Sequence, residues 1–253
     1  MRLLGMLLTL LLAASAAAAE EVILGLSQDE VAITATFDGD EILIFGAVQR
    51  ETPIDADAPL EVVITVEGPS SPVVVRRKER RFGIWVNTDA VEVDAAPSFY
   101  AVTTSGPLDD VLSHTEDVRH DITIDRAVLS RGAPMHILDS QNFSRALIRI
   151  REGEGLYVLH EGGVDLEEQT LFHTNVELPA NLTEGHYAAR IFLTRNGQVV
   201  DLYETPIEVF RVGLGQWLYQ LSRNQPLIYG LMSLMIAIAA GWTASTVFSV
   251  LRR

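Results

Sequence analysis

The chain has 253 residues and a formal net charge of −15 at pH 7, with 19 lysines and arginines against 34 aspartates and glutamates. A surface this acidic repels the phosphate backbone, which argues against binding of nucleic acid. Cysteine is absent, which excludes disulfides, thiolate nucleophiles, zinc fingers and iron–sulfur clusters.

The first residues have the three parts of a secretory signal peptide. A basic start at Arg2 is followed by roughly ten apolar residues and then by an alanine-rich stretch. We expect residues 1–19 to be removed by cleavage after Ala19. The alternative is an uncleaved membrane anchor, although so short an apolar run rarely spans a bilayer.

Residues 20–105 contain short segments rich in Val, Ile and Thr that are separated by Gly, Pro, Asn and Asp. This pattern is typical of an antiparallel sandwich, and it predicts a first β-sandwich domain. Residues 106–139 lose the pattern. They are expected to form a connector with a short helix near 108–114.

Residues 140–212 predict a second β-rich domain with one helix. Apolar residues recur at helical spacing over 141–153, and Ser140 is placed to cap that helix. Further on, Asn196-Gly197 between two apolar segments predicts a hairpin. The expected fold class is therefore mainly β: two immunoglobulin-like β-sandwich units, a minor helical part and one C-terminal transmembrane helix.

A short amphipathic helix is expected over residues 213–225. Leu214, Trp217, Leu218 and Leu221 share one stripe of it, as in helices that lie in the membrane interface. The alternative is that this stripe packs on the preceding domain.

Residues 226–251 contain no charged side chain, and about 20 apolar residues are enough to cross a bilayer as a helix. Arg252 and Arg253 follow directly, which predicts that the two-residue tail is cytoplasmic. Export without cysteine favours a bacterial periplasm over a eukaryotic extracellular setting. The sequence therefore predicts a single-pass protein of the bacterial inner membrane with its N-terminal domain in the periplasm.

Several segments carry a family likeness: Leu43–Ala47, Val75–Arg80, Gly83–Asn87, Pro97–Val102 and Gly241-Trp242. With these the chain resembles Alph_Pro_TM, a family of alphaproteobacterial transmembrane proteins. The resemblance implies a membrane protein without a known activity. It also suggests a sulfite-exporter-like permease as a partner.

Five cations fall within six residues of this acidic chain, and they form the best candidate for partner binding: Arg76, Arg77, Lys78, Arg80 and Arg81. Such a cluster can dock on an anionic patch of a partner, an anionic ligand or lipid headgroups. The alternative is a hairpin whose exposed cations balance neighbouring carboxylates at little energetic gain. Trp85, shortly after the cluster, is expected in the core.

Small residues recur at every fourth position of the predicted span, at Ser233, Ala237, Gly241, Ser245 and Ser249. Small side chains let a second helix approach closely. The pattern predicts packing against another integral membrane protein or self-association through the span.

No motif for catalysis or metal binding is present. The six histidines form no HxH or HExxH pattern, and the chain has no P-loop, no GxGxxG and no complete nucleophile elbow. We therefore assign no catalytic, cofactor or metal residues and expect a non-enzymatic accessory protein, with a transporter as one candidate partner. Two alternatives stay open: a periplasmic ligand- or metal-sensing module whose histidines converge, and a hydrolase with dispersed catalytic residues.

Overall fold

The structure is a computed structural model of the whole chain, and it describes residues 20–28, 30–34, 37–50, 58–128 and 139–251. At residues 20, 21, 50, 214, 216 and 248–251 only the backbone is described. The predicted signal peptide and the predicted tail at 252–253 lie outside the described residues.

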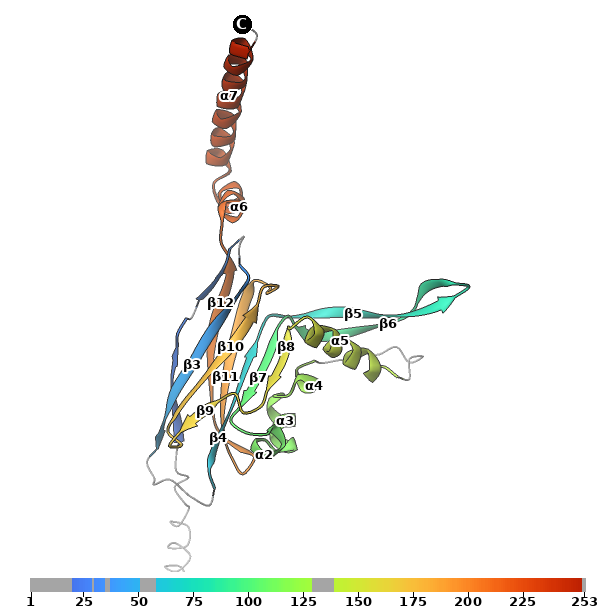
Figure 1. The fold of residues 1–253 in the computed structure, drawn as a ribbon, viewed down its shortest axis with the longest axis vertical. Helices are drawn as coiled ribbons and strands as arrows, with labels where there is room; N and C mark the ends of the chain where they lie inside the picture. Colours follow the sequence, from blue (N-terminus) through green and yellow to red (C-terminus); the bar gives the residue numbers. More distant parts are fainter. Residues whose placement is uncertain (1–19, 29, 35–36, 51–57, 129–138, 252–253) are drawn as a thin grey trace, which may run out of the picture.

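Two sheets form the body of the molecule (Figure 1). The four-stranded sheet has the order β1 (Glu20–Leu26), β3 (Gly39–Arg50), β10 (Leu171–Pro179) and β9 (Asp165–Glu167). The six-stranded sheet has the order β2 (Glu30–Ile33), β12 (Gln198–Arg211), β11 (Gly185–Arg195), β4 (Leu60–Glu67), β7 (Tyr100–Thr104) and β8 (Tyr157–His160).

The order of apolar and polar residues along each strand reflects which of its faces are buried. In β10, every second residue from Phe172 to Leu178 is buried, and the residues between them are exposed, as expected for a strand with one face on the core. In β11, Ile191, Phe192 and Leu193 are all fully buried. Three consecutive buried residues mean that both faces of the six-stranded sheet are covered there. On the outer face, the ring of His120 packs edge-on against Phe192.

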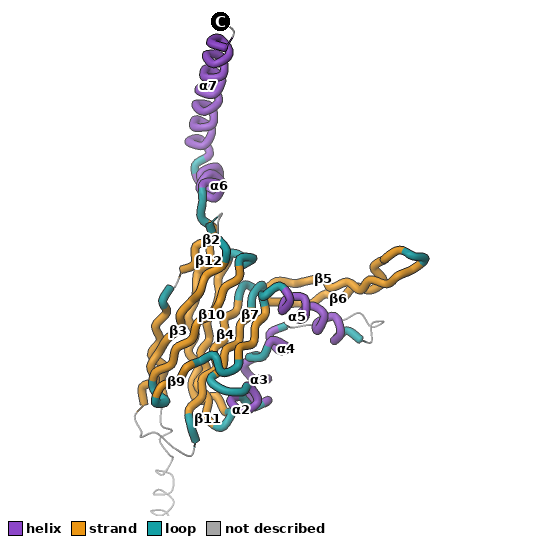
Figure 2. The backbone as a smooth tube through the Cα atoms, viewed as in Figure 1, coloured by secondary structure: helices purple, strands orange, loops and turns teal. Residues whose placement is uncertain are grey.

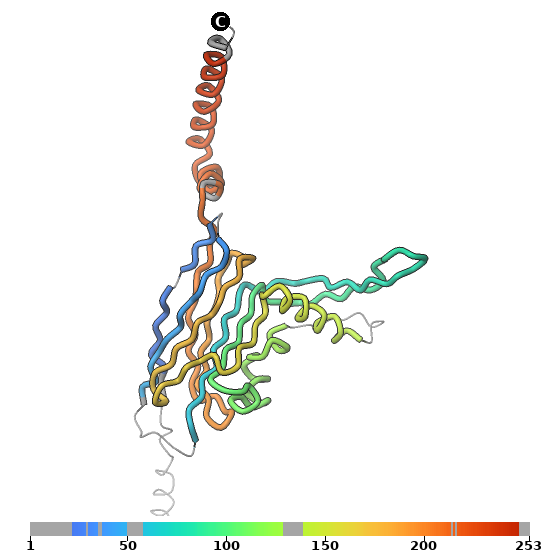
Figure 3. The backbone as a smooth tube through the Cα atoms, viewed as in Figure 1, coloured from blue at the N-terminus to red at the C-terminus, as the bar shows by residue number. Residues whose placement is uncertain are grey.

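Strands from the two halves of the chain pair with each other. Strand β3 pairs with β10, β4 pairs with β11, and β7 pairs with β8; Figure 3 shows blue N-terminal strands beside yellow and orange C-terminal ones. A mainly β chain with one C-terminal apolar helix is confirmed. Two separate sandwich units are not formed, because each half contributes strands to both sheets and a single apolar core joins them.

The predicted connector contains three short helices, α2 (Leu108–Val111), α3 (His114–His120) and α4 (Ile124–Ala127). They are fixed to the sheet at Tyr100, whose hydroxyl donates to the carbonyl of Ile122 at 2.8 Å and accepts from Arg190 at 3.0 Å. Burial raises the pKa of Tyr100 to about 12, so this hydroxyl stays a donor at all ordinary pH values.

Helix α5 (Gln141–Gly153) begins and ends where the sequence predicts. The predicted cap by Ser140 is wrong, because Ser140 already has helical backbone angles and its side chain makes no capping hydrogen bond. The preceding carbonyl of Asp139 accepts from the N–H of Asn142 at 2.9 Å instead. The predicted Asn196-Gly197 hairpin is confirmed, with positive φ at both residues.

The C-terminal part consists of α6 (Leu214–Asn224) and α7 (Pro226–Leu251). Within α7, residues 226–247 form a candidate span of 22 residues with a mean hydropathy of 1.7, long and apolar enough to cross a membrane and not buried in the protein. Helix α6 packs against α7, and Figure 1 shows both helices clear of the sandwich.

A third, two-stranded sheet consists of β5 (Ser70–Arg81) and β6 (Ile84–Pro97). We call it the arm. It leaves the body at the end nearer to α6 and runs roughly across the direction of α7 (Figure 2). At about 3.4 Å per residue, its 12-residue strand β5 reaches about 40 Å.

Candidate interaction site on the arm

The arm is a long antiparallel hairpin that closes at a two-residue turn. Its register runs from Ser70 opposite Pro97 to Arg81 opposite Ile84, with irregularities that include one after Arg77. Phe82 and Gly83 form the turn, both with positive φ. Glycine adopts this conformation readily, whereas a bulky residue such as Phe82 does so at a cost.

An isolated two-stranded hairpin is only marginally stable in water, so the arm needs support at its base. Val91 and Phe143 are buried against each other, and Val75 packs on them. Because Phe143 belongs to α5, this small cluster joins the arm to the helix.

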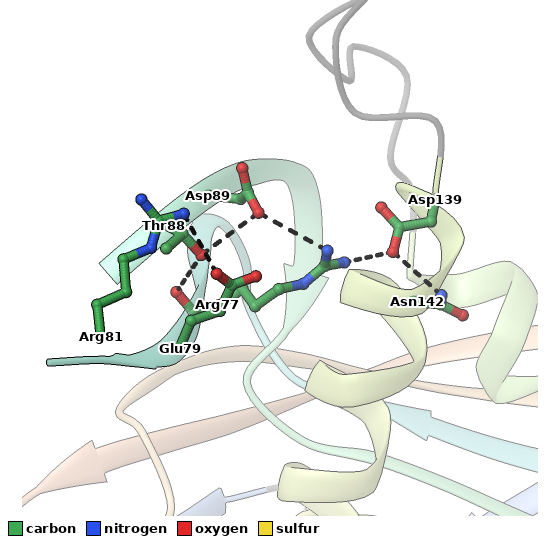
Figure 4. A network of polar contacts seen from close by, with 7 residues as sticks. All are labelled: Arg77, Glu79, Arg81, Thr88, Asp89, Asp139 and Asn142. Carbon is green, nitrogen blue, oxygen red and sulfur yellow. Dashed lines mark hydrogen bonds and ion pairs between the residues drawn. The ribbon is translucent and has the colours of Figure 1, made fainter. Parts of the chain in front are cut away.

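Arg77 is the polar centre of that joint (Figure 4). Its guanidinium donates to the carboxylate of Asp139, lies 3.7 Å from that of Asp89 and sits 4.6 Å from the ring centre of Phe143. The hydrogen bond from Arg77 lowers the pKa of Asp139 below its usual 3.8. Arg77 was predicted to bind a partner. The structure uses it to hold the arm against the start of α5.

The other four predicted cations are exposed. Arg81 lies 3.3 Å from Glu79 on the same strand. Arg76, Lys78 and Arg80 have no ion pair in the described part of the chain, so their charges are available to a partner. The alternative reading, in which exposed cations balance neighbouring carboxylates, therefore applies to only one of these four, Arg81.

The tip of the arm, residues 82–85, carries three large apolar side chains in water. Phe82 is fully exposed, Trp85 is 69% exposed and Ile84 is 64% exposed. The expectation that Trp85 lies in the core is wrong, because no second sheet among the described residues faces this end of the hairpin. In the sequence, the Phe82-Gly83 pair could have located the tip, because it stands where the hairpin turns.

A cavity of about 920 Å³ opens between α4, α5 and the strands β7 and β8. Its described lining includes apolar side chains and charged ones: Val102, Ile124, Ile148 and Leu159, and Asp121, Asp125, Arg126, Arg145 and Glu152. Of the described histidines, only His114 lines it. The convergence of histidines that a metal-sensing site would need is not seen there.

The described histidines are instead spread over the body. His120 lies near Glu116, His173 near Asp165 and His186 near Glu208. Within residues 20–28, 30–34, 37–50, 58–128 and 139–251, no three His, Asp or Glu side chains are grouped to hold a metal ion.

The family model described as "Putative transmembrane protein (Alph_Pro_TM)" matches residues 21–250. The chain belongs to this family. No curated protein matches this member. Among solved structures it is similar to the sporulation control protein Spo0M from Bacillus subtilis, at 10% identity and a TM-score of 0.27. That match covers 83% of the Alph_Pro_TM chain and 56% of the Spo0M chain, and the likeness is too low to carry an argument.

In this Alph_Pro_TM protein the small residues of the span lie on α7, exposed where their side chains are described. The side chain of Ser249 is outside the described set. Steps of four residues advance about 40° beyond a full helical turn. The five positions therefore wind around α7, and only neighbouring ones such as Ala237, Gly241 and Ser245 share a face.

The predicted interfacial residues lie on α6. Trp217 is 52% exposed, and Leu218 and Leu221 are half-buried; the side chain of Leu214 is not described. Since α6 stands clear of the sandwich in Figure 1, packing of this stripe on the body is not seen.

Proposed function

We propose that this protein is a non-enzymatic, membrane-anchored interaction protein that docks on a partner protein through its arm. The tip of the arm carries this proposal. Phe82, Ile84 and Trp85 are held in water beyond the body, and the exposed cations Arg80 and Arg81 lie directly behind them. Exposed apolar groups gathered in one place mark surfaces that another molecule covers.

We place the body and the arm in the bacterial periplasm and the C-terminus in the cytoplasm. The signal-like start and the two arginines after the span support this orientation. A reporter active only in the periplasm is expected to work when fused after Val212, and one active only in the cytoplasm is expected to work after Arg253. The opposite pattern would refute the orientation.

The direction of the arm favours a neighbour in the same membrane. The arm runs across α7 rather than along it (Figure 1), so an α7 that crosses the bilayer upright would hold the arm roughly parallel to the membrane, beside the anchor. We propose that the tip meets the extracytoplasmic side of a transporter, and the family resemblance suggests a sulfite-exporter-like permease. The small residues on α7 would add a helix contact within the bilayer.

The test is recovery of partners with the full-length, tagged chain from native membranes in mild detergent. We expect Phe82→Ser with Trp85→Ser to lose a protein that the unchanged chain retains. The matched control is Val200→Ser with Leu202→Ser, which removes exposed apolar side chains from β12. Equal recovery by both double variants, at equal protein level, would refute docking through the arm.

A further inference from the structure

We infer that the partner of the arm is a protein with an apolar pocket that encloses the tip and with carboxylates along one side of the mouth of that pocket. This inference rests on the proposed function, because it describes the surface that the partner presents to the same site. It follows from the register of the arm, which determines the face of the hairpin on which each side chain lies.

The exposed cations of β5 share one face of the arm, which we call the open face. Successive side chains of a strand point to opposite faces, so Arg76, Lys78 and Arg80 lie on the same one. The order continues past the irregularity after Arg77, because the extra residue there belongs to β6. Glu92 is on the open face too, but it lies nearer to the body. Side chains on one face repeat about every 6.8 Å, so the three cations form a row about 14 Å long.

The opposite face of the arm has its charges paired. At the base it packs on α5, where Val75 and Arg77 are half-buried. Arg77 donates to Asp139, and nearer the tip Arg81 lies 3.3 Å from Glu79 (Figure 4). The three cations of the open face, in contrast, have no ion pair in the described part of the chain. The unpaired positive charge of the arm is therefore confined to one face.

The apolar side chains of the tip lie on both faces. Trp85 stands opposite Arg80 in the register and so lies on the open face. Ile84 stands opposite Arg81 and lies on the other face, and Phe82 is part of the turn that closes the hairpin. A flat surface covers only one face of a hairpin and leaves the other in water. Surroundings that enclose the tip remove all three apolar side chains from water.

A protein pocket and a lipid bilayer can both enclose a hairpin tip, and the distribution of charge distinguishes them. Anionic headgroups surround an inserted tip on every side, which favours unpaired cations on both faces. A protein can place carboxylates on one side of a pocket only, and such complementarity steers the encounter and fixes the orientation. The one-sided row of cations therefore favours a protein whose pocket is acidic along one side.

Lys78 makes the acidic side of the pocket testable, because it is the only lysine in the chain. A carbodiimide joins an amine directly to a carboxylate that it contacts. With the full-length chain in native membranes, we expect Lys78 to become linked to an Asp or Glu of a second protein. Lys78→Arg keeps the positive charge but removes the amine, so this link should be lost. Absence of any link that depends on Lys78 would overturn the inference.

Photocross-linking tests whether the pocket encloses the tip. Benzoylphenylalanine is placed in turn at Phe82, Ile84 and Trp85 of the full-length chain in native membranes. We expect all three positions to form adducts with the protein that Lys78 reaches. The same group at Val200, which is exposed on β12, should not. Adducts from Trp85 but not from Ile84 would indicate a flat contact and would refute the enclosing pocket.

Charge reversal tests whether the row of cations orients the partner. Arg76→Glu with Arg80→Glu is expected to weaken recovery of the linked protein at least about 10-fold. The matched control is Arg145→Glu with Arg149→Glu, which makes the same change in charge at two exposed positions of α5. Its effect should stay within about twofold. Equal loss in the two double variants would mean that only the net charge matters, and the row would have no role.

The outcomes also separate this inference from the proposed function. If the tip forms adducts with a protein but no link depends on Lys78, the acidic pocket is wrong and docking through the arm stands. Adducts that join only two copies of this chain would likewise overturn the pocket on a second protein and leave docking through the arm in place. If the tip forms adducts only with lipid, the tip lies in the bilayer and both proposals are wrong.

Discussion

Replacing Ile191 by Ala tests whether the strands of both halves fold as one unit. Ile191 is fully buried on β11, where it lies between Tyr203 of β12 and Ile64 of β4. Truncating a buried Ile in a close-packed core costs about 2–5 kcal/mol, from lost burial and from the cavity left behind. The control is Val200, which is exposed on β12; changing it to Ala should cost less than about 0.5 kcal/mol.

The magnitude translates into a large thermal shift. For a domain of this size, 1 kcal/mol lowers the midpoint by about 2–4 °C, so Ile191→Ala should lower it by roughly 4–20 °C. The assay is thermal unfolding of residues 20–212, followed by circular dichroism and by amide exchange. Because β3 pairs with β10 and β4 with β11, amides of β3 should lose protection together with those of β11. Two separate transitions, with β1 and β3 unaffected, would refute a single sandwich.

Three further substitutions probe the arm base, the sheet and the span. Asp139→Asn should speed amide exchange near Arg77 without changing the thermal midpoint of the core. Since the pKa of Asp139 is lowered, the contribution of its carboxylate to the stability of the arm base should persist from neutral pH down to about 3.8 and be lost as the pH falls further. Gly46→Ala should destabilise by about 1–3 kcal/mol in a melting assay, because its Cβ would lie 2.5 Å from the ring of Phe172, whereas Gly153→Ala meets no atom and should be neutral. Gly241→Leu should reduce co-purification of a membrane partner if α7 packs closely, and Ile238→Leu should not; equal recovery would make α7 a simple anchor.

Local signals in the sequence predicted local structure well. The bounds of α5 follow from its apolar spacing, and the hairpin at Asn196-Gly197 follows from its turn residues. Both depend on contacts between near neighbours. The pairing of β3 with β10 joins residues more than a hundred positions apart, and no local pattern encodes which distant strand completes a sheet. For this reason the single sandwich was not predicted.

The candidate site was located by charge but not by geometry. The run of cations at 76–81 pointed to the arm, because charge density is visible in a sequence. The inward role of Arg77 was not visible, since Asp139 and Phe143 approach it only through the packing of α5. Trp85 has the type of side chain that usually lies in a core. It is exposed because no sheet in the described part of the chain faces it, which is a property of the fold.

The turn of the arm offers a test in which stability and docking should change in opposite directions. Phe82 has a φ of 50° and is fully exposed, so it strains the turn and gains no burial in the folded chain. Asn-Gly is the preferred pair for such a turn. Phe82→Asn should therefore slow amide exchange across the arm by about fivefold, equivalent to about 1 kcal/mol, and should weaken docking. The measurements are amide exchange of β5 and β6 and recovery of the partner with the same preparation. A variant with a more stable arm and unchanged docking would show that the ring of Phe82 is not part of the contact.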